Sequence, residues 1–336
     1  MWAQCQRISR FLAAHTSAFI LAVAVLSWCV PGVFAWVRGN AQSMVLGAIM
    51  LAMGMTLSAE DWRVLARRPW DILLGVCAQY GIMPLLALLL VWGLGLPRGM
   101  AVGLLLVGCC PGGVSSNIMS LLGRGDVAFS VGMTSATTLL APLATPLLML
   151  WLAGERVEVP AGALFQSILW VTVAPIAVGT LLNHFFGRRP EYGQLCSILP
   201  GVAVLALACI VGGVVSAQGD RFFTQGALIF AGVFLHNALG YALGYLTATA
   251  LRMPPPKRRT LSLEVGMQNA GLATVLATQH FQAHPAAAVA AAISCAWHSL
   301  SGTLLATIFR RTAAQATPEK SSPDGALQKV RSTNDE

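Results

Sequence analysis

Charged residues are scarce in this chain, and their scarcity excludes a soluble protein. Acidic residues number 13 and basic residues 21, so charged side chains make up 10% of the 336 residues, against about 25% in a soluble globular domain. Hydrophobic residues make up 56%, and the mean hydropathy is +0.69. So few charges cannot cover the surface of a soluble protein of this length. The composition therefore predicts a polytopic membrane protein whose main solvent is lipid.

The signatures of the common enzyme classes are also missing. The sequence holds no His-Glu-x-x-His pair, no Gly-x-Ser-x-Gly elbow and no phosphate-binding Gly-x-x-x-x-Gly-Lys loop. Its eight cysteines fall mostly inside apolar runs, without the spacing of a small disulfide-bonded domain, and are interpreted as packing residues. We therefore expect neither an enzyme nor a pump driven by a nucleotide.

Ten apolar segments separated by short loops predict ten transmembrane helices. We expect them at approximately residues 17–37, 41–59, 70–92, 98–122, 127–153, 163–186, 195–215, 223–251, 258–281 and 284–309. Over the alternating loops and tails, 17 of the 21 Lys and Arg residues lie on one side, and the other side holds only Arg38, Arg98, Arg156 and Arg221. By the positive-inside rule both termini are cytoplasmic. The net charge of +8 then reflects membrane orientation rather than nucleic-acid binding. We expect a multi-pass protein of the plasma (bacterial inner) membrane.

The fourth and ninth of these segments are interrupted by helix-breaking residues. The fourth contains Cys109-Cys110-Pro111-Gly112-Gly113-Val114-Ser115-Ser116-Asn117, and the ninth contains Glu264-Val265-Gly266-Met267-Gln268-Asn269-Ala270-Gly271. A helix broken in hydrocarbon leaves unpaired backbone groups that only protein, water or a ligand can satisfy. A matched pair of such breaks indicates the binding site of a secondary transporter.

The placement of the two breaks divides the chain into halves of five helices each. Because an odd number of helices makes the second half enter from the opposite face, we expect a 5+5 inverted repeat, at about 17–153 and 163–309. Residues 1–16 would form a cytoplasmic N-terminal segment and residues 17–311 a ten-helix transporter domain. The polar residues 312–336 would form a disordered cytoplasmic tail.

Glu264 is the one acidic residue expected deep inside a helix. An ionisable group at mid-helix costs roughly 2.5 to 3.5 kcal/mol on insertion scales, and a functional partner usually resolves this cost. The alternative is that Glu264 only decorates a first helical turn after Arg259. The helix-breaking Gly266, Gln268 and Asn269 that follow favour a functional role. One carboxylate among amide and hydroxyl oxygens suits a monovalent cation better than Ca²⁺, so sodium fits, and a proton on Glu264 is the alternative.

The residues after each break begin a new half-helix, whose free N–H groups and positive dipole end attract anions. Ser115, Ser116 and Asn117 follow the first break, and Ala270 and Gly271 follow the second. If the two starts meet in the membrane, they form an anion-binding cradle beside the cation site. For an isolated Pro-Gly-Gly sequence, a simple kink would be the alternative.

These motifs resemble the bile acid:sodium symporter family, in particular its bacterial members. The resemblance runs from about Met44 to Phe309 and is carried by Cys110-Pro111-Gly112-Gly113 through Ser116-Asn117, by Arg124-Gly125-Asp126-Val127-Ala128 with Ser130 and Thr134, by Glu264 through Ala273, and by Trp297-His298-Ser299-Leu300-Ser301-Gly302. It implies an all-α fold of ten helices, with a core domain beside a panel domain. The broken fourth and ninth helices would cross in the core domain.

The resemblance also implies which residues bind the ions and the substrate. Carried over by position, a first sodium site would use Ser116, Asn117, Ser130, Thr134 and Glu264. A second sodium site would use Gln79, Glu264, Val265, Met267 and Gln268, partly through backbone carbonyls. The substrate would face Gly113, Val114, Asn269 and His298.

The implied function is sodium-coupled symport of an organic monocarboxylate anion, pantoate-like or bile-acid-like, into the cytoplasm, for which a monomer suffices. Many bacterial relatives carry a hydroxyl residue where this chain has Val114, so the substrate stays open. Two alternatives keep the architecture. One is a proton-coupled carrier, and the other is an arsenite-type exporter with Cys109 or Cys110 as a soft ligand.

Overall fold

The computed structural model describes residues 2–154, 157–219 and 226–315, and every regular element in these ranges is a helix. Before residue 155 the helices are α1 (Trp2–Ala14), α2 (Thr16–Cys29), the 3₁₀ turn η1 (Pro31–Val33), α3 (Asn40–Thr56), α4 (Ala59–Arg67), α5 (Pro69–Gly93), α6 (Arg98–Cys109), α7 (Ser115–Leu122) and α8 (Val127–Ala153). After residue 156 they are α9 (Ala161–Ile168), the π-helical turn η2 (Leu169–Val173), α10 (Ala174–Phe186), α11 (Pro190–Gln218), α13 (Gly226–Ala250), α14 (Pro255–Gly266), α15 (Ala270–His280) and α16 (Ala286–Gln315).

Six of the described helices are long and apolar enough to cross a membrane. They are α5, α8, the continuous stretch of α9, η2 and α10, α11, α13 and α16. A seventh span is added if α1 and α2, which meet at an angle of 81°, are counted as one. The protein is therefore an all-helical, multi-pass membrane protein. Three predicted segments hold helices that are each too short to be counted among these spans: 41–59, 98–122 and 258–281. The first holds α3, which has 17 residues, and the other two are interrupted.

The ends of the described chain differ from the prediction. The segment predicted at 17–37 stops being α-helical at Cys29, because Pro31 favours extended backbone at Val30 (φ −134°, ψ 75°). Most of the predicted N-terminal segment 1–16 forms α1. At the other end α16 continues to Gln315, so the first four residues of the predicted tail are helical. Residues 316–336, the rest of that tail, lie outside the described part.

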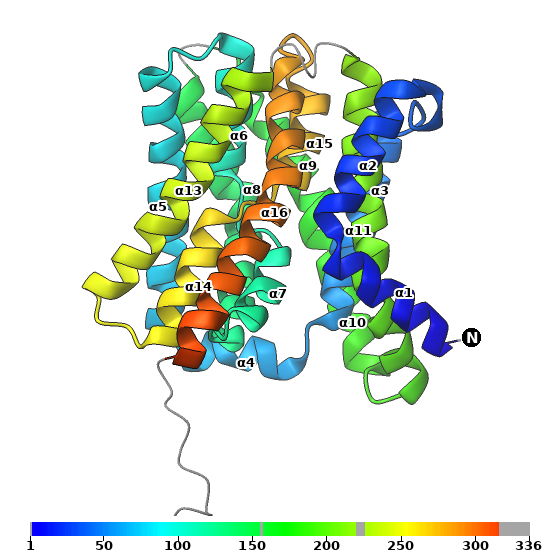
Figure 1. The fold of residues 1–336 in the computed structure, drawn as a ribbon, viewed down its shortest axis with the longest axis vertical. Helices are drawn as coiled ribbons and strands as arrows, with labels where there is room; N and C mark the ends of the chain where they lie inside the picture. Colours follow the sequence, from blue (N-terminus) through cyan, green and yellow to red (C-terminus); the bar gives the residue numbers. More distant parts are fainter. Residues whose placement is uncertain (1, 155–156, 220–225, 316–336) are drawn as a thin grey trace, which may run out of the picture.

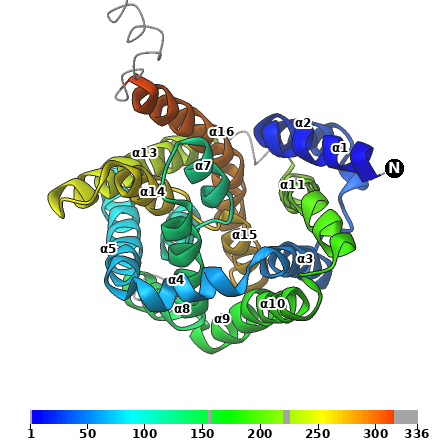
Figure 2. The ribbon, with the colours of Figure 1, turned by 90° about the horizontal axis from the view of Figure 1, so that it is seen from below.

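The helices pack into two groups (Figures 1 and 2). The small group consists of α1, α2, α3, α10 and α11, and the large group consists of α5, α6, α8, α13, α14 and α16. The short helices α7 and α15 pack on the large group, and α15 also touches α3 and α11 of the small group. The helix α15, which follows the second break, therefore lies where the groups face each other.

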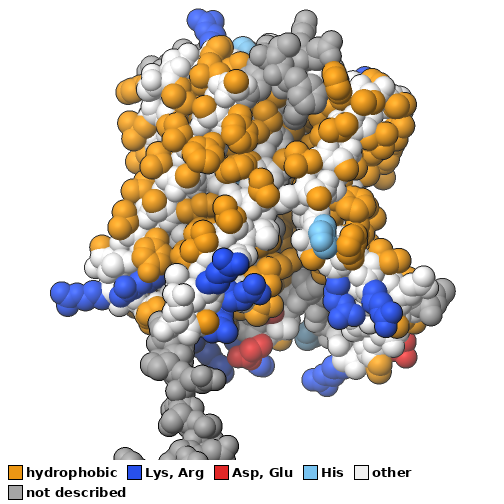
Figure 3. All heavy atoms as spheres, viewed as in Figure 1, with side chains coloured by type: hydrophobic (Ala, Val, Ile, Leu, Met, Phe, Trp, Pro, Cys, Tyr) orange, Lys and Arg blue, Asp and Glu red, His pale blue; other side chains and the backbone are white. Residues whose placement is uncertain are grey.

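Basic side chains gather at one end of the molecule, below a surface that is largely hydrophobic in Figure 3. This arginine-rich end carries α4, the loop between α7 and α8, and the start of α14. Arg68 forms an ion pair with Asp126 at 2.9 Å, and Arg259 donates to the carbonyl of Arg124 at 2.8 Å, so the three segments are in contact. The asymmetry that the sequence predicts is thus present in space.

Candidate functional site

Both breaks occur inside the predicted motifs. The helix α6 ends at Cys109, and Cys110 is extended (φ −74°, ψ 158°), as expected for a residue before proline. The helix α14 ends at Gly266, and Met267 is extended (φ −100°, ψ 102°). The side chain of Asn269 then accepts from the N–H of Leu272 at 3.0 Å and caps the start of α15.

The two broken segments pair with each other through their backbones. The N–H of Gly113 donates to the carbonyl of Met267 at 2.8 Å, and the N–H of Asn269 donates to the carbonyl of Pro111 at 2.8 Å. A Cβ atom on Gly113 would lie 2.8 Å from the carbonyl oxygen of Gln268, so only glycine permits this approach. Each break thus satisfies backbone groups that the other leaves free, which a lipid-exposed break could not achieve.

Glu264 lies at the centre of a fully buried polar cluster, and its own exposed fraction is 0%. Ser116 on α7 donates to one carboxylate oxygen at 2.5 Å, and Ser130 on α8 donates to the same oxygen. Thr134, one turn further along α8, donates to the other oxygen at 2.7 Å. Two consecutive helices, α7 and α8, therefore deliver three hydroxyl groups to one carboxylate on the distant helix α14.

Asn117 completes this cluster with an amide oxygen, which lies 2.8 Å from the hydroxyl oxygen of Ser130 and 3.3 Å from that of Thr134. Among the described residues Glu264 forms no ion pair with a basic side chain. A buried carboxylate without a positive partner is costly unless it takes up a proton or a cation. The described residues hold no group of three or more His, Cys, Asp or Glu side chains that could bind a metal ion. The arrangement therefore offers one carboxylate among hydroxyl and amide oxygens.

A second polar group continues from the cluster toward α5. The Nε2 of Gln79 donates to the Oε1 of Gln268 at 2.6 Å and to the carbonyl of Cys110 at 3.4 Å. The Nε2 of Gln268 donates to the carbonyl of Val265 at 2.6 Å. The Oε1 of Gln79 is buried and has no hydrogen-bond partner among the described residues. A cation or a hydrogen-bond donor would satisfy this orphaned oxygen.

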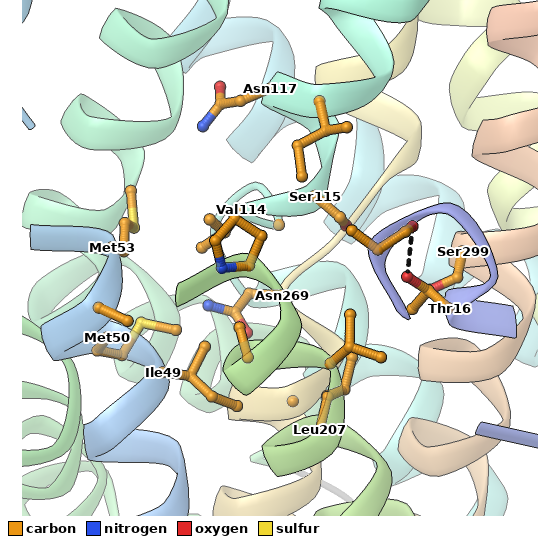
Figure 4. A pocket seen from close by; sticks show the side chains of 18 of the residues that line it. Thr16, Ile49, Met50, Met53, Val114, Ser115, Asn117, Leu207, Asn269 and Ser299 are labelled. Atoms are coloured by element: carbon orange, nitrogen blue, oxygen red, sulfur yellow. Dashed lines mark hydrogen bonds between the residues drawn. The ribbon is translucent and has the colours of Figure 1, made fainter. Parts of the chain in front are cut away.

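A cavity of about 410 Å³ lies between the two groups of helices, beside the Glu264 cluster (Figure 4). All four predicted substrate residues line it: Gly113, Val114, Asn269 and His298. Asn117 and Gln268 line it as well, so two side chains belong to both the polar groups and the cavity wall. Figure 4 shows Asn269 pointing between Met50 and Val114.

The cavity carries no lysine or arginine among the described residues that line it, and Asp61 on α4 is its single charged residue. Two buried nitrogens on its wall, Nδ2 of Asn269 and Nε2 of His298, have no hydrogen-bond partner in the described part. Ala270 and Gly271, at the start of α15, also line it. Donors near an anion here are therefore amide, imidazole, hydroxyl and helix-start N–H groups.

The wall formed by the small group was not predicted. It contains Ile49, Met50 and Met53 on α3 and Leu207 on α11. Both helices are apolar, and although α11 contains Pro200, no pattern in the sequence distinguishes their cavity-facing residues. Asn237 on α13 donates to the carbonyl of Gly266 at 2.8 Å and so joins α13 to the end of α14.

Cys109 and Cys110 are fully buried and do not line the cavity. The hydroxyl of Thr145 donates to the backbone carbonyl of Cys109 at 2.7 Å. The backbone of this pair is therefore part of the break, and its thiols do not face the cavity where a transported ion or molecule would lie.

The profile of the family described as "Sodium Bile acid symporter family" matches residues 43–225. The chain belongs to this family. The sodium bile acid symporter family is a transporter family, so the protein is a membrane transporter and not an enzyme.

Relatives of the family match most of the chain. The Bacillus subtilis protein named "Uncharacterized sodium-dependent transporter YocS" is 44% identical over 306 residues, which cover 91% of this chain and 94% of the relative. The Arabidopsis thaliana protein named "Probable sodium/metabolite cotransporter BASS1, chloroplastic" is 39% identical over 283 residues, which cover 84% of this chain and 70% of the relative. A rice relative named "Probable sodium/metabolite cotransporter BASS2, chloroplastic" is 34% identical over 91% of this chain and 73% of its own length.

Proposed function

We propose that this transporter couples the entry of sodium to the uptake of an organic monocarboxylate, pantoate-like or bile-acid-like, across a bacterial plasma membrane. One observation carries the proposal: among the described residues the buried carboxylate of Glu264 accepts hydrogen bonds only from hydroxyl groups, next to a cavity that no described lysine or arginine lines. The names of the family and of its bacterial and plant relatives contain the word sodium, which supports the choice of ion.

The first sodium ion would be held by the cluster around Glu264. Its ligands would be the carboxylate and the oxygens of Ser116, Ser130, Thr134 and Asn117, which already converge within hydrogen-bonding distance. Each hydroxyl that now donates to the carboxylate also has lone pairs that a cation can use. Oxygen ligands of this kind suit a hard cation.

The second sodium ion would lie toward Gln79, whose buried Oε1 has no hydrogen-bond partner among the described residues. Glu264, Gln268 and the backbone carbonyls of Val265 and Met267 would supply the other ligands. Those carbonyls now accept from Gln268 and Gly113 respectively, so binding would exchange or share these hydrogen bonds.

Coupling would follow from the residues that belong to both places. Asn117 and Gln268 contact the proposed ion ligands and also line the cavity. Sodium would therefore order the cavity wall before the substrate carboxylate binds Asn269, His298 and the N–H groups near Gly113 and Val114. Sodium would also supply the positive charge that the cavity wall itself lacks.

The architecture would be the ten-helix inverted repeat with its two-domain division. The large group of helices would be the core domain and the small group the panel domain. The arginine-rich end would face the cytoplasm with both termini, following the positive-inside rule. The cavity reaches Asp61 on α4, at that same end, so rocking of one group against the other would release the ions and the substrate to the cytoplasm. A single copy of the chain contains all of these parts.

The proposal is tested by uptake into proteoliposomes of radiolabelled pantoate and of a bile acid, each driven by a sodium gradient or by a proton gradient alone. We expect accumulation only with the inward sodium gradient. Accumulation with the proton gradient alone would instead establish the proton-coupled alternative, in which Glu264 carries the proton. Absence of uptake under both conditions, in vesicles that contain folded protein, would refute carboxylate symport.

A further inference from the structure

A second cavity, of about 330 Å³, lies at the end of the molecule opposite the arginine-rich end. It is formed by the start of α3, the last turns of α11 and the segment that joins α15 to α16. No residue lines both cavities. Its polar lining consists mainly of amide side chains and one cation, and the residues used below are Arg38, Gln42 and Gln279.

Arg38 is the single charged residue among the described residues that line this second cavity. It forms no ion pair within the described part of the chain. Gly39 follows with φ of +53°, in the left-handed region that favours glycine, and α3 begins at Asn40. Arg38 therefore lies two residues before the start of a 17-residue helix, whose N-terminal end is positive. Both features attract an anion.

Gln42 supplies an independent indication of a ligand. Its side chain lies in the first turn of α3, is only 1% exposed, and lines the second cavity. Its Oε1 atom is buried without a hydrogen-bond partner in the described part. Buried polar atoms are normally paired, and an orphaned one calls for an explanation. A hydroxyl or amide hydrogen on a bound molecule would provide the missing donor.

Gln279, near the end of α15, lines the second cavity and contacts the start of α3. Its Nε2 donates to the carbonyl of Gly39 at 3.4 Å and to the hydroxyl of Ser43. These contacts join α15, which packs on the large group of helices, to α3 of the small group. They lie at the end of the molecule that the first cavity does not reach. In the proposed orientation, the second cavity would face the outside while the passage to the first cavity is closed.

We propose that the second cavity is a capture site for small hydroxycarboxylates. Arg38 and the start of α3 bind the carboxylate, and Gln42 accepts a hydrogen bond from the hydroxyl group. That the captured anion is afterwards transported rests on the proposed function. The capture site contains none of the proposed sodium ligands, so its binding of a carboxylate does not require sodium. The first cavity, which no described lysine or arginine lines, would require it.

The decisive measurement is binding of pantoate, a small hydroxycarboxylate, to the purified full-length protein in sodium-free buffer. We compare the wild type with Arg38→Gln and with the matched control Arg98→Gln, which removes a charge from the start of α6 and lines neither cavity. We expect binding by the wild type and the control, and a three- to tenfold weaker affinity for Arg38→Gln, since a partly exposed charge-assisted contact is lost. Equal affinity in all three proteins, or no sodium-free binding by the wild type, overturns the capture site.

A kinetic measurement separates capture from a structural role. In sodium-driven pantoate uptake, Arg38→Gln and Gln42→Leu should raise KM by similar factors and leave kcat unchanged, because the first cavity is untouched. Arg38→Lys should recover part of the affinity, since it keeps the charge without the planar fork. A loss of kcat without a change in KM overturns the proposal. If the wild type shows no sodium-dependent uptake, the proposed function fails, and the sodium-free binding result still decides the capture site.

Discussion

Replacing Glu264 by glutamine tests the proposed sodium site most directly, because the change removes one charge and keeps the shape of the side chain. Hydroxyl groups lie 2.5 and 2.7 Å from the carboxylate oxygens. A cation that the carboxylate coordinates lies within about 4 Å of the negative charge, and at 4 Å two unit charges already interact by about 4 kcal/mol at an effective dielectric constant of 20. At about 1.4 kcal/mol per factor of ten, the variant should bind sodium roughly a thousandfold more weakly.

The assay is thermal unfolding of the purified protein in sodium chloride and in choline chloride of equal ionic strength. At a sodium concentration about 100 times Kd, the wild type gains about 2.7 kcal/mol of stability. Under the same conditions Glu264→Gln should gain less than about 0.1 kcal/mol by the same relation. Without sodium, the variant should be at least as stable as the wild type, because it buries no unpaired charge.

The matched control is Ser262→Ala, two residues earlier on α14. Ser262 is equally buried, but its hydroxyl donates to the carbonyl of Tyr241 at 2.8 Å and does not contact the cluster. This control should lose some stability in both salts and keep the full gain on adding sodium. If sodium stabilises Glu264→Gln as much as it stabilises the wild type, the carboxylate is not a sodium ligand and the reasoning is wrong.

Two further predictions concern the first break. Gly113→Ala places a Cβ atom 2.8 Å from the carbonyl of Gln268. It should therefore cost about 1–3 kcal/mol and abolish sodium-driven uptake; normal uptake with an unchanged melting temperature would show that the close crossing is unnecessary. The double variant Cys109→Ala with Cys110→Ala should lose stability but keep carboxylate uptake, because neither thiol lines the cavity. Loss of an arsenite-export activity in that variant would favour the exporter instead.

The two breaks could be predicted because helix breaking is a local property. Proline at 111 and the glycines at 112 and 113 disfavour a helix whatever surrounds them. The backbone pairing between the breaks could not be derived from composition, because it joins residues more than 150 positions apart. The expectation that the broken helices cross came from the family resemblance alone.

The oxygen cluster shows the same limit. Glu264 is conspicuous in the sequence as an acid in an apolar segment, but nothing near it in the chain indicates Ser116 or Ser130 as partners. Those partners lie 148 and 134 residues away and were named through the family resemblance. Serine and threonine in membrane helices most often bond to their own backbone, so residue type alone does not identify them as ligands.

By itself the sequence determined that lipid is the main solvent, that basic residues concentrate on one side, and where two helices break. Each of these follows from composition or from local backbone preference. Only the tertiary structure decided which hydroxyls surround Glu264, which apolar residues of α3 and α11 form the cavity wall, and that Gln42 is buried without a partner beside Arg38. These features depend on how helices distant in sequence pack together. In a uniformly apolar helix, the sequence does not show which residues face other helices and which face lipid.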